Sequence, residues 1–462
     1  MNHKGCDTCS DGVNRRDFLR LGGTGVALGL MGMSLESVLF TKAALGVQPE
    51  NAFYDGVLTI FYNGGPSQTD TWDPKPGSRN NVFNTINLGA KDKYNEDVHI
   101  SEVFPDIANL VQNDPAVSLG LIRAFWHGSN DHGTGQRYMN TWWRSQALSQ
   151  QYPSVASAMA YYFQGKGIGI PSVVINGANG DAANMANASR CPTALQVNAG
   201  ANQGNNPVVQ SLQLPPGVDQ ARYDRRKALL DRLNQRFLAS RPDQVARAAE
   251  KATEDAHAVT SGGQAARAFD LTGKTLLPAQ NMQTAQRMTL AQELLAAGIP
   301  YVAVGLGGND SHSNNMQAVR TIWGDTTNRS VAAMAQNLKA TGKRYLILMY
   351  GDFGRTPASV ANGRDGRDHW GGGFSVAMLS VNQPKFVTTA IGSTGPDGLQ
   401  QWNTGALDPI APADLGAFVY RSLGIQIGRP DGSFDIPLNG REAPPVDRMN
   451  NSDLLMSTFG LV

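Results

Sequence analysis

Residues 56–70 have the sequence GVLTIFYNGGPSQTD, in which an apolar run ends abruptly in a polar, glycine-rich turn. A short apolar run bounded by Gly and Asn is typical of a strand buried in a parallel sheet. Similar runs recur along the chain at Ser118–Phe125, Pro171–Asn176, Tyr301–Gly305, Arg344–Tyr350 and Phe374–Leu379. We therefore predict that all of these segments are buried parallel strands.

Helical patterns alternate with these strands. They occupy Ser154–Tyr162, Met282–Ala297, Asn328–Ala340 and Pro412–Leu423. Alternation of this kind predicts an α/β fold with a doubly wound, mainly parallel sheet flanked by helices. Ligands of such folds bind just beyond the carboxyl ends of the strands. Polar motifs that directly follow a strand are therefore the candidates for function.

One segment interrupts the alternation. Residues 219–270 are strongly helical and rich in charge, and they show no strand pattern. We interpret them as part of a helical insertion over about residues 207–280, within one domain that spans residues 46–462. The basic run in this segment is typical of a solvated helix face.

The composition excludes several classes of protein. The chain has 462 residues, with 39 Lys and Arg against 38 Asp and Glu, so its formal charge of +1 offers no basic field for nucleic acid. The apolar fraction of 41% suits a packed globular core and not a disordered chain. Three Cys, two of them at positions 6 and 9, exclude a disulfide scaffold.

The first 45 residues have the features of an export signal. The pair Arg15-Arg16 precedes a mildly apolar stretch over residues 21–40 that contains five Gly and Glu36, too weak for a transmembrane helix. We predict a twin-arginine signal peptide, recognised by the twin-arginine export machinery. The mature protein is then periplasmic or extracellular, exported folded and without a stable membrane span. The alternative is an amphipathic N-terminal helix of the mature protein.

Two polar motifs follow the first two predicted strands. Asn63–Asp70 contains paired Gly, which lets the backbone approach a ligand closely and directs N–H groups at an anion. His127–Gln136 holds two His and an Asp on a glycine-rich loop. An imidazole beside a carboxylate is a typical metal-ligand pair, or a base with its orienting acid. Thr134 or Ser129 can supply a nucleophilic hydroxyl.

Three more motifs follow later strands. Asp310 and His312 lie on a Gly-Gly loop, at a spacing that can direct both at one metal or one proton. Asp352 comes directly after a buried strand, and Arg355 is placed to bind an oxyanion. A charged loop ends in His369, before three Gly. Each motif taken alone can be a capped turn, a surface ion pair or a satisfied core His. Because strand-end loops converge at one sheet edge, together they predict one shared polar site.

The order of these motifs resembles that of one bacterial family, domain of unknown function 1501 of the alkaline phosphatase and sulfatase superfamily. The motifs are the twin-arginine leader, GGPSQ, NDHGTG, GGNDSHSNN, GDFGRTP and GRDHW. The resemblance extends from the leader to about Gly424. It implies an alkaline-phosphatase-like α/β core and hydrolysis of phosphate or sulfate esters at one or two metal ions.

The same resemblance implies roles for individual residues. Asp310 and His312 match two ligands of one metal, Asp352 the carboxylate of the other, and His369 the late histidine ligand. The loop from Asp131 to Thr134 matches the nucleophile region. Candidate metal ligands are therefore Asp310, His312, Asp352, His369 and Asp131, and catalytic candidates are Thr134, Ser67, His132 and Arg355. The nucleophile is Thr134 first, then Ser67, then a water at the metal.

The chain departs from active relatives at two ligand positions. Asn63 stands at the end of the first strand, where the superfamily's phosphatases usually have Asp. Phe353 follows Asp352, where an Asp-His pair is usual. Within the family the third motif usually reads Trp-Asp-Thr-His and the fourth Gly-Glu-Phe-Gly; here they read Asn-Asp-Ser-His and Gly-Asp-Phe-Gly. We therefore expect a site with one metal or none.

The preferred interpretation is an exported hydrolase of phosphate or sulfate esters, acting on a small anionic substrate with a divalent metal. Zinc or manganese suits carboxylate and imidazole ligands. The alternative is a family member that has lost catalysis and binds a ligand or partner in the periplasm. An oxidoreductase with an organic cofactor has little support, because no Gly-x-Gly-x-x-Gly motif follows the first strand.

Overall fold

One sheet of eight strands organises the described part of the chain, in the order β12-β4-β11-β8-β1-β7-β5-β6. The structure is a computed structural model. It describes residues 51–144, 152–163, 169–176, 194–199, 264–358, 365–427 and 451–462, with short pieces between 219 and 232 and between 435 and 446. The predicted signal peptide and most of the predicted helical insertion lie outside these residues, so both remain predictions. No helix within them combines the length and the apolar character needed to span a bilayer.

The sheet contains all the strands predicted from the apolar runs. Its members are β1 (Gly56–Tyr62), β4 (Val117–Phe125), β5 (Ser172–Ile175), β6 (Leu195–Val197), β7 (Tyr301–Leu306), β8 (Tyr345–Gly351), β11 (Phe374–Val381) and β12 (Thr389–Ile391). The short strands β6 and β12 carry too few residues to be recognised from sequence. The predicted α/β class is confirmed.

Strand β11 runs against its neighbours. It pairs antiparallel with both β4 and β8, whereas every other pair in the sheet is parallel. The prediction that Phe374–Leu379 is a parallel strand was therefore wrong in direction. The cause is a small hairpin of β9 (Gly354–Arg355) and β10 (His369–Trp370), which keeps the chain at the carboxyl edge after β8. From there the chain enters β11 backwards.

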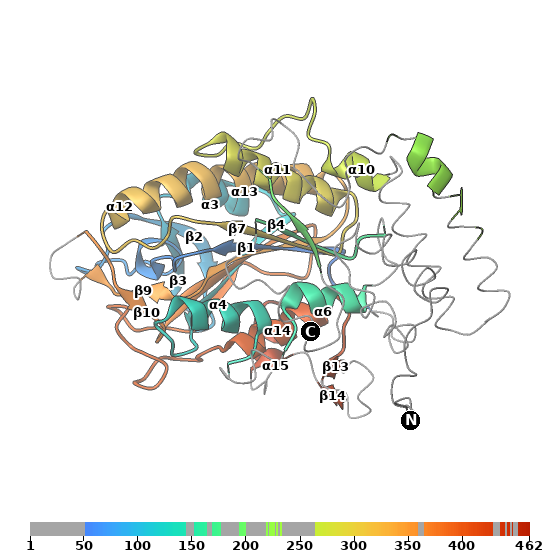
Figure 1. The fold of residues 1–462 in the computed structure, drawn as a ribbon. Helices are drawn as coiled ribbons and strands as arrows, with labels where there is room; N and C mark the ends of the chain where they lie inside the picture. The colour runs from blue at the N-terminus through green and yellow to red at the C-terminus, as the bar shows by residue number, and fades with distance from the viewer. Residues whose placement is uncertain are drawn as a thin grey trace, which may run out of the picture.

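Helices cover both faces of the sheet (Figure 1). One face carries α3 (Pro105–Asn113), α11 (Met282–Ala296) and α13 (Arg329–Lys339), with α10 (Gln264–Phe269) and α12 (Asn315–Ala318) nearby. The other face carries α4 (His132–Thr141), α6 (Val155–Tyr162), α14 (Pro412–Ser422) and α15 (Ser452–Thr458). The helices predicted from periodicity are all present. A π-helix, Val319–Asn328, leads into α13.

The alternation of side chains along β1 divides the core into two layers. Leu58 and Ile60 belong to the cluster beneath α11 and α13, and Val57 and Phe61 belong to the cluster beneath α6 and α14. All residues of β1 are buried, as expected for a central strand with helices on both sides. The site described below therefore rests on a strand held by two apolar layers.

Two more hairpins lie outside the main sheet. They are β2 (Thr85–Lys91) with β3 (Asp97–Ser101), and β13 (Ile436–Leu438) with β14 (Arg441–Ala443). Neither hairpin was predicted; β2 and β3 are partly exposed and lack a continuous apolar run.

Candidate metal centre

Three neighbouring strands end in register at one edge of the sheet. Tyr62, the last residue of β1, pairs with Leu306 of β7 on one side and with Gly351 of β8 on the other. The loops that follow these strands therefore start side by side. This is the edge at which parallel α/β sheets bind their ligands.

Paired glycines let these loops pack backbone against backbone. Gly64 has φ 111°, and a Cβ at this position would lie 2.2 Å from the backbone nitrogen of Asp310. Gly65 has φ 80°, and its Cβ would lie 2.6 Å from the ring of Phe353. Only Gly allows both the positive φ and the close approach. The Gly-Gly pair therefore brings Asp310 and the loop after β8 to the same place.

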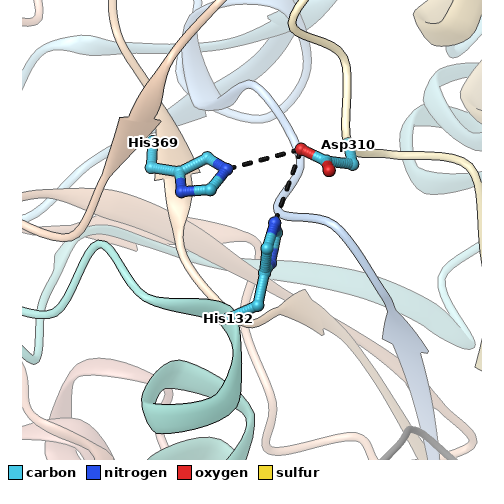
Figure 2. Close-up of side chains that lie close together, drawn as sticks. All are labelled: His132, Asp310 and His369. Atoms are coloured by element: carbon cyan, nitrogen blue, oxygen red, sulfur yellow. Dashed lines mark hydrogen bonds and ion pairs between the residues drawn. The ribbon is translucent and has the colours of Figure 1, made fainter.

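Three imidazoles point at one oxygen of Asp310. Figure 2 shows the rings of His132 and His369 directed at this oxygen. Their Nε2 atoms lie 3.4 Å from Asp310 Oδ1, and Nε2 of His312 lies 3.1 Å from it. His132 begins α4, His369 comes from β10, and Asp310 and His312 share the loop after β7. The loops thus converge on one carboxylate.

The opposite ring nitrogen of each imidazole is held by an acceptor. Nδ1 of His132 lies 2.6 Å from Asp352 Oδ2, Nδ1 of His312 lies 3.1 Å from Asp368 Oδ1, and Nδ1 of His369 lies 2.7 Å from the carbonyl oxygen of Asn130. An acceptor at Nδ1 favours the tautomer with its proton on Nδ1 and a free lone pair on Nε2. Metal-binding imidazoles are usually oriented in this way.

The donor set fits a divalent cation. Ligand atoms of His132, Asp310 and His369 all lie within 4.8 Å of one another, which is compatible with a common metal ion. Nε2 of His132 is buried and has no hydrogen-bond partner. A buried polar atom without a partner is costly unless something else satisfies it. Two imidazoles and a carboxylate, with His312 beside them, are ligands suited to zinc or manganese.

The pKa values reflect this arrangement. The hydrogen bond to Asp352 raises the pKa of His132 above its usual value. Burial tends to raise the pKa of Asp310, but the hydrogen bond and charge of Arg355 outweigh it and lower that pKa to about 2. Asp310 is therefore ionised across the physiological range and always available as an anionic ligand.

Asp352 lies behind the cluster and not in it. Its side chain is fully buried, Oδ1 accepts from the backbone N–H of Gly64 at 3.1 Å, and Oδ2 holds His132. The predicted metal ligand thus has both oxygens engaged by the protein. It is placed to orient His132, as an outer partner of the metal site does.

The predicted hydroxyl nucleophiles and Asp131 make local hydrogen bonds. Ser67 is 1% exposed and donates to Asp70 Oδ2 at 2.6 Å. Asp131 caps the start of α4 by accepting from the backbone N–H of Thr134 at 2.8 Å. Thr134 lies in the first turn of that helix and also hydrogen-bonds the Asp131 side chain. These residues have clear structural roles, namely a buried turn and an N-cap.

Arg355 also differs from its predicted role. The side chain is 0% exposed, so its guanidinium cannot reach an oxyanion in solvent. Its donors bind the carbonyl oxygens of Gly64, Gly65, Asn309 and Arg367 and the carboxylate of Asp310. Arg355 therefore links the loops that follow β1 and β7 to the segment before β10, through hydrogen bonds on the buried side of the site.

Three residues of the quoted motifs were not singled out as site residues. His127 is buried, with Nε2 2.5 Å from the carbonyl oxygen of Asp352 and Nδ1 accepting from the N–H of Ser129 at 3.1 Å. Burial lowers the pKa of His127 to about 4, so the ring is neutral. Asn130 and Asp368 hold His369 and His312. Their only sequence signal is adjacency to the predicted ligands.

The molecule is thus an α/β protein with a cluster of imidazoles around a carboxylate at the carboxyl edge of its central strands. Residues 54–383 match the model of the family described as "Protein of unknown function (DUF1501)". The chain belongs to this family, as its motifs predicted. No curated protein matches the chain.

Several solved structures are similar in overall arrangement at low identity. The C-terminal periplasmic domain of EptC from Escherichia coli, in complex with Zn, is 9% identical with a TM-score of 0.35, over 82% of this chain and 83% of that one. The phosphoglycerol transferase GacH of Streptococcus pyogenes, in complex with sn-glycerol-1-phosphate, is 11% identical with a TM-score of 0.35, over 88% and 83%. The lipoteichoic acid synthase LtaP of Listeria monocytogenes is 8% identical with a TM-score of 0.34, over 84% and 78%. At these scores we infer no activity from them.

Proposed function

We propose that this protein is a metal-dependent hydrolase of phosphate or sulfate esters. The observation that carries the proposal is the convergence of three imidazole Nε2 atoms on Asp310 Oδ1, each ring fixed from behind. His132, Asp310 and His369 would hold the metal ion, with His312 as a further ligand. When bound, a zinc or manganese ion would polarise the ester and supply positive charge for its oxygens.

The site is accessible to an anionic substrate from solvent. The side chains of Asp310 and His312 are about half exposed, at 51% and 50%, so a small ester can reach them. Asp352 and Asp368 keep the rings of His132 and His312 directed inward. Ser67 is buried and the Thr134 side chain hydrogen-bonds the N-cap Asp131, and we propose that a water molecule attacks the ester.

Metal removal and restoration test this proposal. Protein purified without a tag should contain zinc or manganese, and dialysis against a chelator should lower its melting temperature. Added metal should raise the melting temperature with the logarithm of free metal, because it binds only the native state. Hydrolysis of p-nitrophenyl phosphate or p-nitrophenyl sulfate should appear in the metal-containing protein, be lost on chelation and return on reloading. A melting temperature that changes neither on chelation nor on metal addition would contradict the proposal. Metal binding without hydrolysis of either ester would favour the alternative, a periplasmic binding protein without catalysis.

We also propose that the protein is exported folded by the twin-arginine route. The support is the Arg15-Arg16 pair before a mild apolar stretch. Replacing both residues, Arg15→Lys and Arg16→Lys, should leave unprocessed precursor in the cytoplasm, detected by fractionation and immunoblotting. Normal processing of the double variant would contradict this route.

A further inference from the structure

Arg355 is a cation enclosed within the site. Its side chain is 0% exposed, and Nη2 lies 2.7 Å from Asp310 Oδ1, the same oxygen toward which the three imidazoles point. A guanidinium keeps its charge at any physiological pH. Asp310 is therefore shared between a permanent positive charge and the proposed metal position.

The other partners of Arg355 fix where that charge lies. Four backbone carbonyls accept from the guanidinium, those of Gly64, Gly65, Asn309 and Arg367. These partners come from the loops after β1 and β7 and from the segment before β10. Because a planar guanidinium donates in fixed directions, it cannot move without breaking these hydrogen bonds. The position of its positive charge is therefore fixed in the folded protein.

The described residues offer ligands for one metal ion. Two-metal sites hold their ions about 3.5–4 Å apart and use both to clamp an anionic substrate. Within the described residues only one cluster of His and Asp side chains is close enough for a metal, that of His132, Asp310 and His369. Asp352, the next carboxylate, is buried and engaged by Gly64 and His132. The cation beside Asp310 is already Arg355.

We propose that Arg355 takes the place of a second metal ion, so that the site holds one divalent metal and one built-in guanidinium. This inference rests on the proposed function and makes Arg355 a positioning residue. It acts on an anionic ester through Asp310 and through its field, without touching the substrate. One divalent metal and the guanidinium together supply three positive charges, one fewer than two divalent metals would provide.

Two substitutions separate the charge of Arg355 from its role in joining the loops. Arg355→Lys keeps the charge and loses the planar fork; Arg355→Gln loses both. The charge repels the metal and attracts the anion, and a unit charge at this range corresponds to roughly tenfold or more in affinity. Compared with Arg355→Lys, Arg355→Gln should bind zinc more tightly and, once loaded, bind inorganic phosphate at least ~tenfold more weakly. Isothermal titration measures both affinities.

A purely structural role would give a different pattern. If Arg355 only joins the loops, both variants should lose zinc and phosphate affinity together, and that result would overturn the inference. Arg344→Gln is the matched control, because Arg344 pairs with Asp55 at 3.1 Å at the opposite end of β8 and should leave both affinities unchanged.

The stoichiometry of the wild-type protein is a second test that needs no variant. Elemental analysis after saturation and gel filtration should give one metal per chain. Two metals per chain would overturn the inference and leave the proposed function standing. A chain that binds no metal would instead contradict the proposed function itself.

Discussion

Asp310→Asn should abolish the response of the protein to metal. The substitution keeps an oxygen for Arg355 but removes the negative charge at the point where the imidazoles converge. Loss of an outer partner of a metal ligand typically costs about 10–100-fold in affinity, so loss of the ligand charge itself should cost more than ~100-fold. The measurement is zinc affinity by competition with a chromophoric chelator, together with the shift of melting temperature on metal addition.

Two further carboxylates provide controls in the same assay. Asp352→Asn should have an intermediate effect of about 10–100-fold, because Asp352 orients His132 without joining the cluster. Asp368→Asn should change the affinity least, since the Asp368 side chain is 78% exposed and pairs with His312, the most exposed of the three imidazoles. Wild-type affinity in Asp310→Asn would exclude the cluster as the metal site.

Gly64→Ala should strongly destabilise the fold. Its Cβ would lie 2.2 Å from the backbone nitrogen of Asp310 and 2.6 Å from the carbonyl carbon of Asn309, and φ is 111°. Backbone atoms cannot turn aside as a flexible side chain can. We expect a loss of about 3–5 kcal/mol in the free energy of unfolding, at the upper end of overpacking effects because backbone strain is added.

Urea denaturation, followed by circular dichroism, measures this loss. Gly307→Ala is the control. Gly307 lies on the neighbouring loop, with nothing within 4 Å of the added Cβ and no positive φ. Its stability should stay within about 0.5 kcal/mol of the wild type. Equal stability of the two variants would show that the loops do not need the close contact at Gly64.

The sequence predicted the strands of the sheet because each is a continuous apolar run. A strand buried on both faces, such as β1, consists almost entirely of apolar residues. A partly exposed strand such as β2 does not. The direction of β11 could not be predicted in the same way. It depends on the β9–β10 hairpin, in which Gly354–Arg355 pairs with His369–Trp370, and a pair of two-residue strands has no pattern of its own.

The convergence of these residues could be predicted, but the environment of each side chain could not. His132, Asp310, Asp352 and His369 follow strands or lie beside them, and strand ends meet at one edge. Whether a carboxylate faces solvent or the protein is decided by packing. Asp310 is half exposed, whereas Asp352 is fully buried, although both follow a strand and a glycine. Arg355 is likewise buried because carbonyl oxygens from distant segments surround its guanidinium. A sequence motif gives no information about these acceptors.

The ligands of the proposed metal come from positions 132, 310 and 369, which are far apart in the sequence and meet only at the edge of the finished sheet. An unfinished chain holds at most fragments of this set, because β7 and β8 must first pair with β1 in register. Uptake of the proposed metal would therefore report that the sheet has formed. On the proposed function, metal bound before export would stabilise only those molecules whose sheet has already formed.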